Sequence, residues 1–171
     1  MLIRRAEATD AEAIAQVHVA SWQSTYRGIV PDIYLDNMSV ERRVEYWGSI
    51  LSKPLYEHEL IVLEQQGQVV GFANGGPNRE RKYRYDAEIY ALYLLQRVQG
   101  QGYGKAMVHQ LIESFSREGY RSMLVWALKD NPAVQFYERL GAKPIEQKEI
   151  MIGGIALMEC ALGWGDLTAA L

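Results

Sequence analysis

The stretch Val98-Gln99-Gly100-Gln101-Gly102-Tyr103-Gly104-Lys105 decides the fold of this chain. Its glycines stand at alternate positions and follow the apolar run 89–95 after four intervening residues. The residues behind it carry apolar side chains that recur at helical spacing, so they share one face of a helix. The pattern predicts a strand, a glycine turn and the start of a helix. The apolar helix positions are Met107, Val108, Leu111, Ile112 and Phe115.

A glycine turn that leads into a helix is suited to binding an anion. The first N–H groups of a helix have no intrahelical partner, and the helix dipole is positive at this end. Glycines have no Cβ, so their backbone can close around an anionic group, above all a pyrophosphate. The stretch therefore predicts a site for a phosphorylated cofactor.

The spacing of the glycines excludes two of the three families that use such a turn. The phosphate loop of nucleoside triphosphatases needs a glycine where Gln99 stands and a hydroxyl where Ala106 stands. The dinucleotide fingerprint G-x-G-x-x-G puts its third glycine at Lys105 or at Met107, depending on the start. The remaining pattern is Q-x-x-G-x-G, which Gln99, Gly102 and Gly104 satisfy.

This pattern resembles the acetyl-coenzyme A pyrophosphate loop of the GNAT superfamily of N-acetyltransferases. A second segment, 131–142, is similar to the family's N-x-x-A-x-x-F-Y-x-x-x-G-F pattern, with the alanine shifted by one position and Ala142 in place of the last Phe. The runs 18–28 and 88–93 resemble stand-alone bacterial members, among them polyamine acetyltransferases.

Composition favours one domain, residues 1–171, because 171 residues with 49% hydrophobic content suffice for one sizeable core. The net charge of -3 argues against a nucleic-acid partner. No apolar run approaches the roughly 20 residues that cross a bilayer, so we expect no membrane partner. The lone Cys160 and the lack of a long apolar core at the start of the chain favour a reducing cytoplasm.

Periodicity and turn signals predict strands at 2–6, 60–63, 69–73, 88–95, 122–128, 149–152 and 155–162. Helices are expected between them: one from a capping box at Thr9, one after Pro31 that Pro54 ends, one after the glycine loop, and a short one capped by Asn131. This order matches the GNAT order. It implies an α/β (α+β) fold with a mixed, mostly antiparallel central sheet of about seven strands and helices on both faces. The basic loop 78–86 is expected to be solvated.

The resemblance implies where a cofactor binds. In the family, a bulge in the cofactor strand frees backbone groups for the pantetheine arm of coenzyme A, and a glycine loop holds the pyrophosphate. Asn131 is expected to cap its helix and to bond to the pantetheine arm as well. The implied cofactor-binding residues are Leu92, Tyr93 and Leu94 on the strand, Gln99, Gly100, Gly102, Gly104 and Lys105 in the loop, and Asn131.

The resemblance also implies two catalytic residues. An alkyl amine with a pKa near about 10 is mostly protonated at neutral pH, so its attack on a thioester needs a base. Glu88 stands at the family's position for this base. Tyr137 matches the tyrosine whose hydroxyl protonates the departing thiolate. Alternatively, Glu88 is a strand-end carboxylate that binds a cationic substrate, and Tyr137 is a core tyrosine.

Aromatic residues of the N-terminal helices, Trp22 and Tyr26 with Tyr34 and Trp47, fall where the family forms its acceptor pocket, although such residues are more often core. The histidines do not stand at metal-ligand spacing, so we expect no metal.

The sequence thus predicts an acetyl-CoA-dependent N-acetyltransferase. The acceptor is a primary amine of a small molecule, with a polyamine-like molecule as one option, and it attacks the thioester directly in a ternary complex. The alternatives are a non-catalytic acyl-CoA-binding module and an acetyltransferase of protein or peptide N-termini. The resemblance allows a homodimer.

Overall fold

The computed structural model of the chain describes residues 1–53, 58–80 and 82–170. Within them, seven strands form one sheet in the order β1-β2-β3-β4-β5-β7-β6. Neighbouring strands are antiparallel except β4 and β5, which are parallel. The predicted mixed, mostly antiparallel sheet is confirmed. The strands are β1 Leu2–Arg5, β2 Glu59–Gln65, β3 Gln68–Pro77, β4 Ala87–Leu94, β5 Met123–Leu128, β6 Lys143–Ile152 and β7 Ile155–Trp164.

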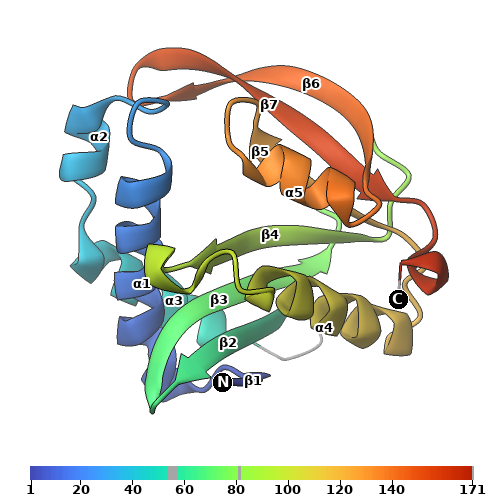
Figure 1. Cartoon of the computed structure of the whole chain (residues 1–171), viewed down its shortest axis with the longest axis horizontal. Helices are drawn as coiled ribbons and strands as arrows, with labels where there is room; N and C mark the ends of the chain where they lie inside the picture. Colours follow the sequence, from blue (N-terminus) through green and yellow to red (C-terminus); the bar gives the residue numbers. More distant parts are fainter. Residues whose placement is uncertain (54–57, 81, 171) are drawn as a thin grey trace.

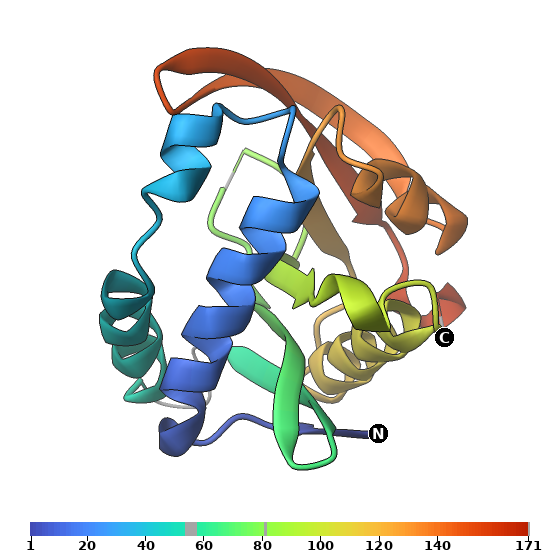
Figure 2. The ribbon, with the colours of Figure 1, turned by 60° about the vertical axis from the view of Figure 1, so that its left-hand side comes forward.

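Helices cover both faces of this sheet, as predicted. On one face, α1 packs beside α3, where Ile14, Trp47 and Phe72 form a buried cluster. On the other face, α4 buries Met107, Leu111 and Phe115, as its periodicity predicts. Figures 1 and 2 show α1 and α3 on one side and α4 on the other. The helices are α1 Ala11–Thr25, α2 Asp32–Asp36, α3 Val40–Leu51, α4 Tyr103–Arg117 and α5 Ala133–Arg139, with short 3₁₀ turns η1 Ala8–Asp10, η3 Gln96–Val98 and η4 Leu167–Ala169.

Three local predictions need correction. The helical region after Pro31 divides into α2 and α3, because the Ser39 side chain accepts a hydrogen bond from the Arg42 N–H and so caps a new helix. The capping box predicted at Thr9 is wrong: the Asp10 carboxylate accepts from the Glu7 N–H instead. β6 begins six residues before the predicted 149, because it pairs with β7 along nearly its whole length. Pro54, the predicted end of α3, lies outside the described residues.

The two parallel strands stay together for a short distance before they diverge. Their pairing runs from Ala87 opposite Met123 to Ile89 opposite Val125. Beyond Ile89, β4 keeps its hydrogen bonds to β3 alone, while β5 continues along β7. In Figure 1, β5 and α5 lie above β4, and the segment from η3 into α4 lies below it. Beyond Ile89, none of the described strands pairs with this edge of β4.

Candidate active site

A cavity of about 630 Å³ lies where β4 and β5 diverge. Its walls come from the C-terminal end of α1, from β4 and β5, from the glycine loop and from the start of α5. Ligand sites of proteins commonly have volumes in this range. The cavity is lined by all nine predicted cofactor-binding residues, Leu92, Tyr93, Leu94, Gln99, Gly100, Gly102, Gly104, Lys105 and Asn131.

Several backbone N–H groups of the glycine loop make no hydrogen bond to the described residues. Gly100 and Gly102 have φ values of +72° and +84°, a conformation that favours glycine, and a Cβ at either position would meet no atom within 4 Å. Within the described residues, the backbone N–H groups from Gly100 to Lys105 have no hydrogen-bond acceptor. These donors at the start of α4, beside open space, fit a pyrophosphate.

The strand β4 carries the bulge that the resemblance implies for the cofactor strand. The register between β3 and β4 shifts where Asn74 faces Ala91 and Gly75 faces Ile89, so the extra residue is Tyr90. Backbone groups at residues 92–94 are freed by the divergence from β5, not by a bulge at those residues. One of them is already used, because Gln99 Nε2 donates to the Leu94 carbonyl at 2.9 Å. The bulge itself is at Tyr90.

Tyr137 lies at the wall of the cavity and is almost fully buried, with 4% of its surface exposed. Its ring contacts Phe136 and meets the Trp164 ring edge-on at 6.0 Å. Burial raises the pKa of Tyr137 above its usual value, as does the neighbouring Tyr93. The phenol therefore stays protonated at neutral pH and is available as a hydrogen-bond donor.

Glu88 is not among the residues that line the cavity. Its carboxylate is 3% exposed and binds Arg79 at three points: Nη2 at 2.5 Å, Nε at 3.2 Å and the backbone N–H at 3.1 Å. The Arg79 guanidinium lies 4.1 Å from the centre of the Tyr90 ring. The side chain of Arg79 is 60% exposed, as expected for a solvated loop, but its guanidinium also pairs with a carboxylate nine residues along the chain.

The loop around Arg79 is held in shape by Asn78. The Nδ2 group of Asn78 donates to the carbonyls of Glu80, Tyr83 and Tyr85 at 3.0 to 3.2 Å. These bonds hold the backbone next to Arg79, the residue that pairs with Glu88.

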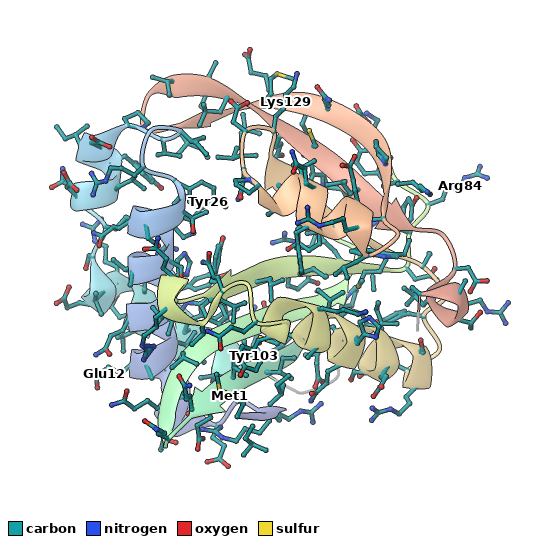
Figure 3. All side chains as sticks on the ribbon, in the orientation of Figure 1. Met1, Glu12, Tyr26, Arg84, Tyr103 and Lys129 are labelled. Carbon is teal, nitrogen blue, oxygen red and sulfur yellow. The ribbon has the colours of Figure 1, made fainter. Side chains whose placement is uncertain are left out.

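Tyr26 and Trp22 have different places in the site. Tyr26 lines the cavity, and its hydroxyl accepts a hydrogen bond from Asn131 Nδ2. Burial raises the pKa of Tyr26 to about 12. Figure 3 labels Tyr26 at the end of α1, beside the space between α1 and α5. Trp22 does not line the cavity; it packs behind it, with ring centres 4.6 Å from Tyr26 and 6.3 Å from Tyr34.

Sequence reasoning missed Ser21 and Trp126, which line the same cavity. Within the described residues, the buried Ser21 Oγ and Trp126 Nε1 have no hydrogen-bond partner. A buried polar atom without a partner is costly unless a ligand or water satisfies it. Trp126 stands in the apolar run of β5, and nothing in that run distinguishes it from a core residue.

In the parts of the chain that are described, no group of three or more His, Cys, Asp or Glu could hold a metal, and no helix is long and apolar enough to span a membrane.

Comparisons with known proteins agree with this geometry. The sequence profile of the Acetyltransferase (GNAT) family matches residues 13–142. YuaI, an uncharacterized N-acetyltransferase of Bacillus subtilis (strain 168), is 36% identical over 167 residues, which cover 98% of this chain and 94% of the relative. The chain therefore belongs to the GNAT family and is an acyltransferase of the N-acetyltransferase type.

Solved structures show the same fold. PaiA N-acetyltransferase from Thermoplasma acidophilum, in complex with coenzyme A, has a TM-score of 0.72 at 19% identity and covers 92% of this chain and 96% of its own. The putative acetyltransferase yncA from Salmonella typhimurium, with acetyl-CoA, has a TM-score of 0.73 at 22% identity and covers 98% and 94%.

Proposed function

We propose that this protein transfers the acetyl group of acetyl-coenzyme A to a primary amine of a small molecule, within a ternary complex. One observation carries the proposal: the unpartnered N–H groups of residues 100–105 open onto the cavity beside the free edge of β4. Two structural neighbours hold coenzyme A or acetyl-CoA, which supports the choice of donor. The donor supplies an acetyl thioester, and the chain supplies the groups that hold it.

The loop and the strand would bind different parts of the donor. The N–H groups from Gly100 to Lys105 would donate to the pyrophosphate, and the Lys105 side chain adds a positive charge beside them. The backbone of Leu92 and Tyr93, on the edge of β4 that β5 leaves, would pair with the amides of the pantetheine arm. Asn131 would add a side-chain contact while it caps α5 through its bond to the Ala133 N–H.

Two proton transfers accompany the reaction. The amine nitrogen bonds to the acetyl carbon, the carbon–sulfur bond breaks, and the sulfur leaves as a thiolate that takes a proton from Tyr137. This transfer is uphill, because a buried phenol is a weaker acid than a thiol of pKa about 8.5. We propose that Glu88 accepts the amine proton. The proton would pass through a water molecule, because the Glu88 carboxylate does not line the cavity and Arg79 donates to both of its oxygens.

Two experiments test the proposal. Calorimetry should show that acetyl-CoA binds, and a free-thiol assay with a panel of amines, including spermidine, should show turnover. Binding without turnover on any amine would favour a non-catalytic acyl-CoA-binding module. Intact-mass analysis of a peptide panel would reveal transfer to N-termini instead. No heat with millimolar acetyl-CoA would refute the proposal as a whole.

The setting of the enzyme is also a proposal. We place it in the cytoplasm, where a buried free thiol such as Cys160 stays reduced. We further propose a homodimer through the β6–β7 hairpin, which exposes Met151, Ile155 and Met158. Light scattering should give twice the mass of the chain, and a monomer at micromolar concentration would contradict the dimer.

A further inference from the structure

Two aromatic residues line the active-site cavity at the point where β4 and β5 separate. Tyr90 and Trp126 directly follow Ile89 and Val125, the last paired residues of the two strands, and both line the cavity. The glycine loop lies beyond the other end of β4, after Leu94, where Figure 1 shows the chain leading into α4. Four residues of extended strand span about 13 Å. Tyr90 and Trp126 therefore lie at the end of the cavity opposite the proposed pyrophosphate site.

This end of the cavity is where the acceptor would enter. The proposed donor pairs with the backbone of Leu92 and Tyr93 and has its pyrophosphate at the glycine loop, so its thioester points toward Tyr90. The amine attacks that thioester. The carbon skeleton of the acceptor would therefore lie against Tyr90 and Trp126.

Each of these two rings already carries a cation of the protein. The Arg79 guanidinium carbon lies 4.1 Å from the centre of the Tyr90 ring, and Lys148 Nζ lies 3.9 Å from the centre of the Trp126 ring. Neither Arg79 nor Lys148 lines the cavity, so neither cation stands between its ring and the cavity. The attraction that an aromatic face offers to a cation is thus used within the protein.

The carboxylates that hold these two cations are themselves occupied. Glu88 pairs with Arg79. Lys148 pairs with Glu80 and, at 3.4 Å, with Glu159. These three carboxylates are therefore not available to an ammonium group of a ligand.

The lining of the cavity offers no replacement. Within the described residues, no Asp or Glu lines the cavity, and its charged lining residues are Lys105 and Arg139, both cations. The same end is otherwise apolar, with Ile89, Ala91 and Val125 in its wall. An ammonium group that entered it would lose hydration without gaining a counter-charge.

We infer that the acceptor is a monoamine with an uncharged, apolar carbon skeleton, and that Tyr90 and Trp126 select it by packing against that skeleton. The inference rests on the proposed function and names its substrate class. A polyamine does not fit, because its second ammonium group would find neither a free carboxylate nor an unoccupied aromatic ring.

A matched pair of amines tests this selection. Hexylamine and 1,5-diaminopentane have the same length, but the diamine has an ammonium group where hexylamine has a methyl group. Alkyl amines of this kind have pKa values of about 10, so deprotonation of the reacting amine does not separate them. In the free-thiol assay, we expect kcat/KM for hexylamine to exceed that for the diamine by about tenfold or more. Equal or better turnover of the diamine would overturn the inference and leave the proposed function intact.

Substitution of Lys148 tests why the diamine is excluded. Lys148→Met removes the cation from the Trp126 ring and frees Glu80 and Glu159, so the preference for hexylamine should fall by about threefold or more. Lys143→Met, an exposed lysine of the same strand, is the matched control and should keep the wild-type preference. An unchanged preference in folded Lys148→Met would refute this explanation.

A second variant tests the contact with the ring and does not depend on Lys148→Met folding. Trp126→Leu should raise KM for hexylamine by about tenfold, with little change in the affinity for acetyl-CoA, because it removes apolar surface at the acceptor end alone. Unchanged KM for hexylamine would refute the contact.

A binding measurement separates this inference from the proposed function. If no amine is turned over, calorimetry with hexylamine and with 1,5-diaminopentane, in the presence of coenzyme A, still reports the selection. Tighter binding of hexylamine would support the inference without the enzyme activity. Equal binding of the two amines, or no binding of hexylamine, would refute it.

Discussion

The side chain of Asn131 joins two walls of the active-site cavity. Its Nδ2 group donates to the hydroxyl of Tyr26 at 3.2 Å, across 105 residues of sequence, while its Oδ1 accepts from the Ala133 N–H at 2.9 Å. One amide thus fixes the start of α5 and ties it to the end of α1. The position of Tyr137, one turn further along α5, depends on this connection.

We expect the bond between Tyr26 and Asn131 to be measurable in stability. Tyr26→Phe should lower the free energy of unfolding by about 1 kcal/mol, because it leaves the buried Nδ2 donor unpaired. Asn131→Ala should cost about 1 to 3 kcal/mol, since it also removes the cap. Urea unfolding of both variants and the double variant forms a thermodynamic cycle with a coupling of about 1 kcal/mol. Additive effects would show that the contact contributes nothing.

Gly102→Val should weaken acetyl-CoA binding by about 100-fold or more, because a side chain would fill the space meant for phosphate oxygens. Gly119→Val is the matched control: its φ is +89° against +84° at Gly102, and the space around both is open. Both variants should lose similar stability, since both strain a left-handed backbone. Calorimetry would measure the affinity of both variants for acetyl-CoA. Wild-type affinity in Gly102→Val would refute the binding of the pyrophosphate by the glycine loop.

Tyr137→Phe should lower kcat by about ten- to a thousand-fold with little change in acetyl-CoA affinity, as for the loss of one proton donor. Tyr120→Phe, at the far end of α4, controls for the general effect of removing a phenol. Steady-state kinetics with both variants would test this, and unchanged turnover in Tyr137→Phe would exclude it as the acid.

Glu88→Gln should lower kcat/KM at neutral pH by about 100-fold or more if the carboxylate takes the amine proton. The deficit should narrow as the pH rises toward the amine pKa of about 10, because the substrate then loses its proton without help. Arg79→Gln, which frees the carboxylate, should retain most of the turnover. If Glu88→Gln loses no kcat/KM, or loses the same factor at every pH, then Glu88 is only the structural partner of Arg79.

His18 should make folding sensitive to acid. Its Nδ1 accepts from Trp47 Nε1 at 3.1 Å, and burial lowers its pKa from 6.5 to about 3, assisted by Arg43. The unfolded chain therefore binds a proton below pH 6.5 that the folded protein does not. This contribution to stability is fully present above pH 6.5 and falls toward pH 3, by at most about 1.4 kcal/mol per pH unit.

The variant His18→Asn should lose that pH dependence, because Asn Oδ1 can accept the Trp47 bond and does not titrate. Urea unfolding between pH 4 and 7 would measure the difference in slope, with His109→Gln as the matched control. Parallel stability curves for wild type and His18→Asn would contradict the assignment.

Local features of the site could be predicted from sequence because they depend on neighbouring residues. Gly100 and Gly102 adopt left-handed φ values that few other residues tolerate, and the apolar spacing from Met107 to Phe115 defines the buried face of α4. The Asn131 cap likewise needs only the Ala133 N–H, two residues away. The order of strands and helices, with the family resemblance, was enough to predict the sheet.

The tertiary structure decided what depends on distant pairings. The place where β4 leaves β5, the extra residue at Tyr90 and the contact of Tyr26 with Asn131 are set by the register of strands and helices, which no short segment specifies. Arg79 looks like one solvated cation among several in the sequence, yet the fold places it on Glu88.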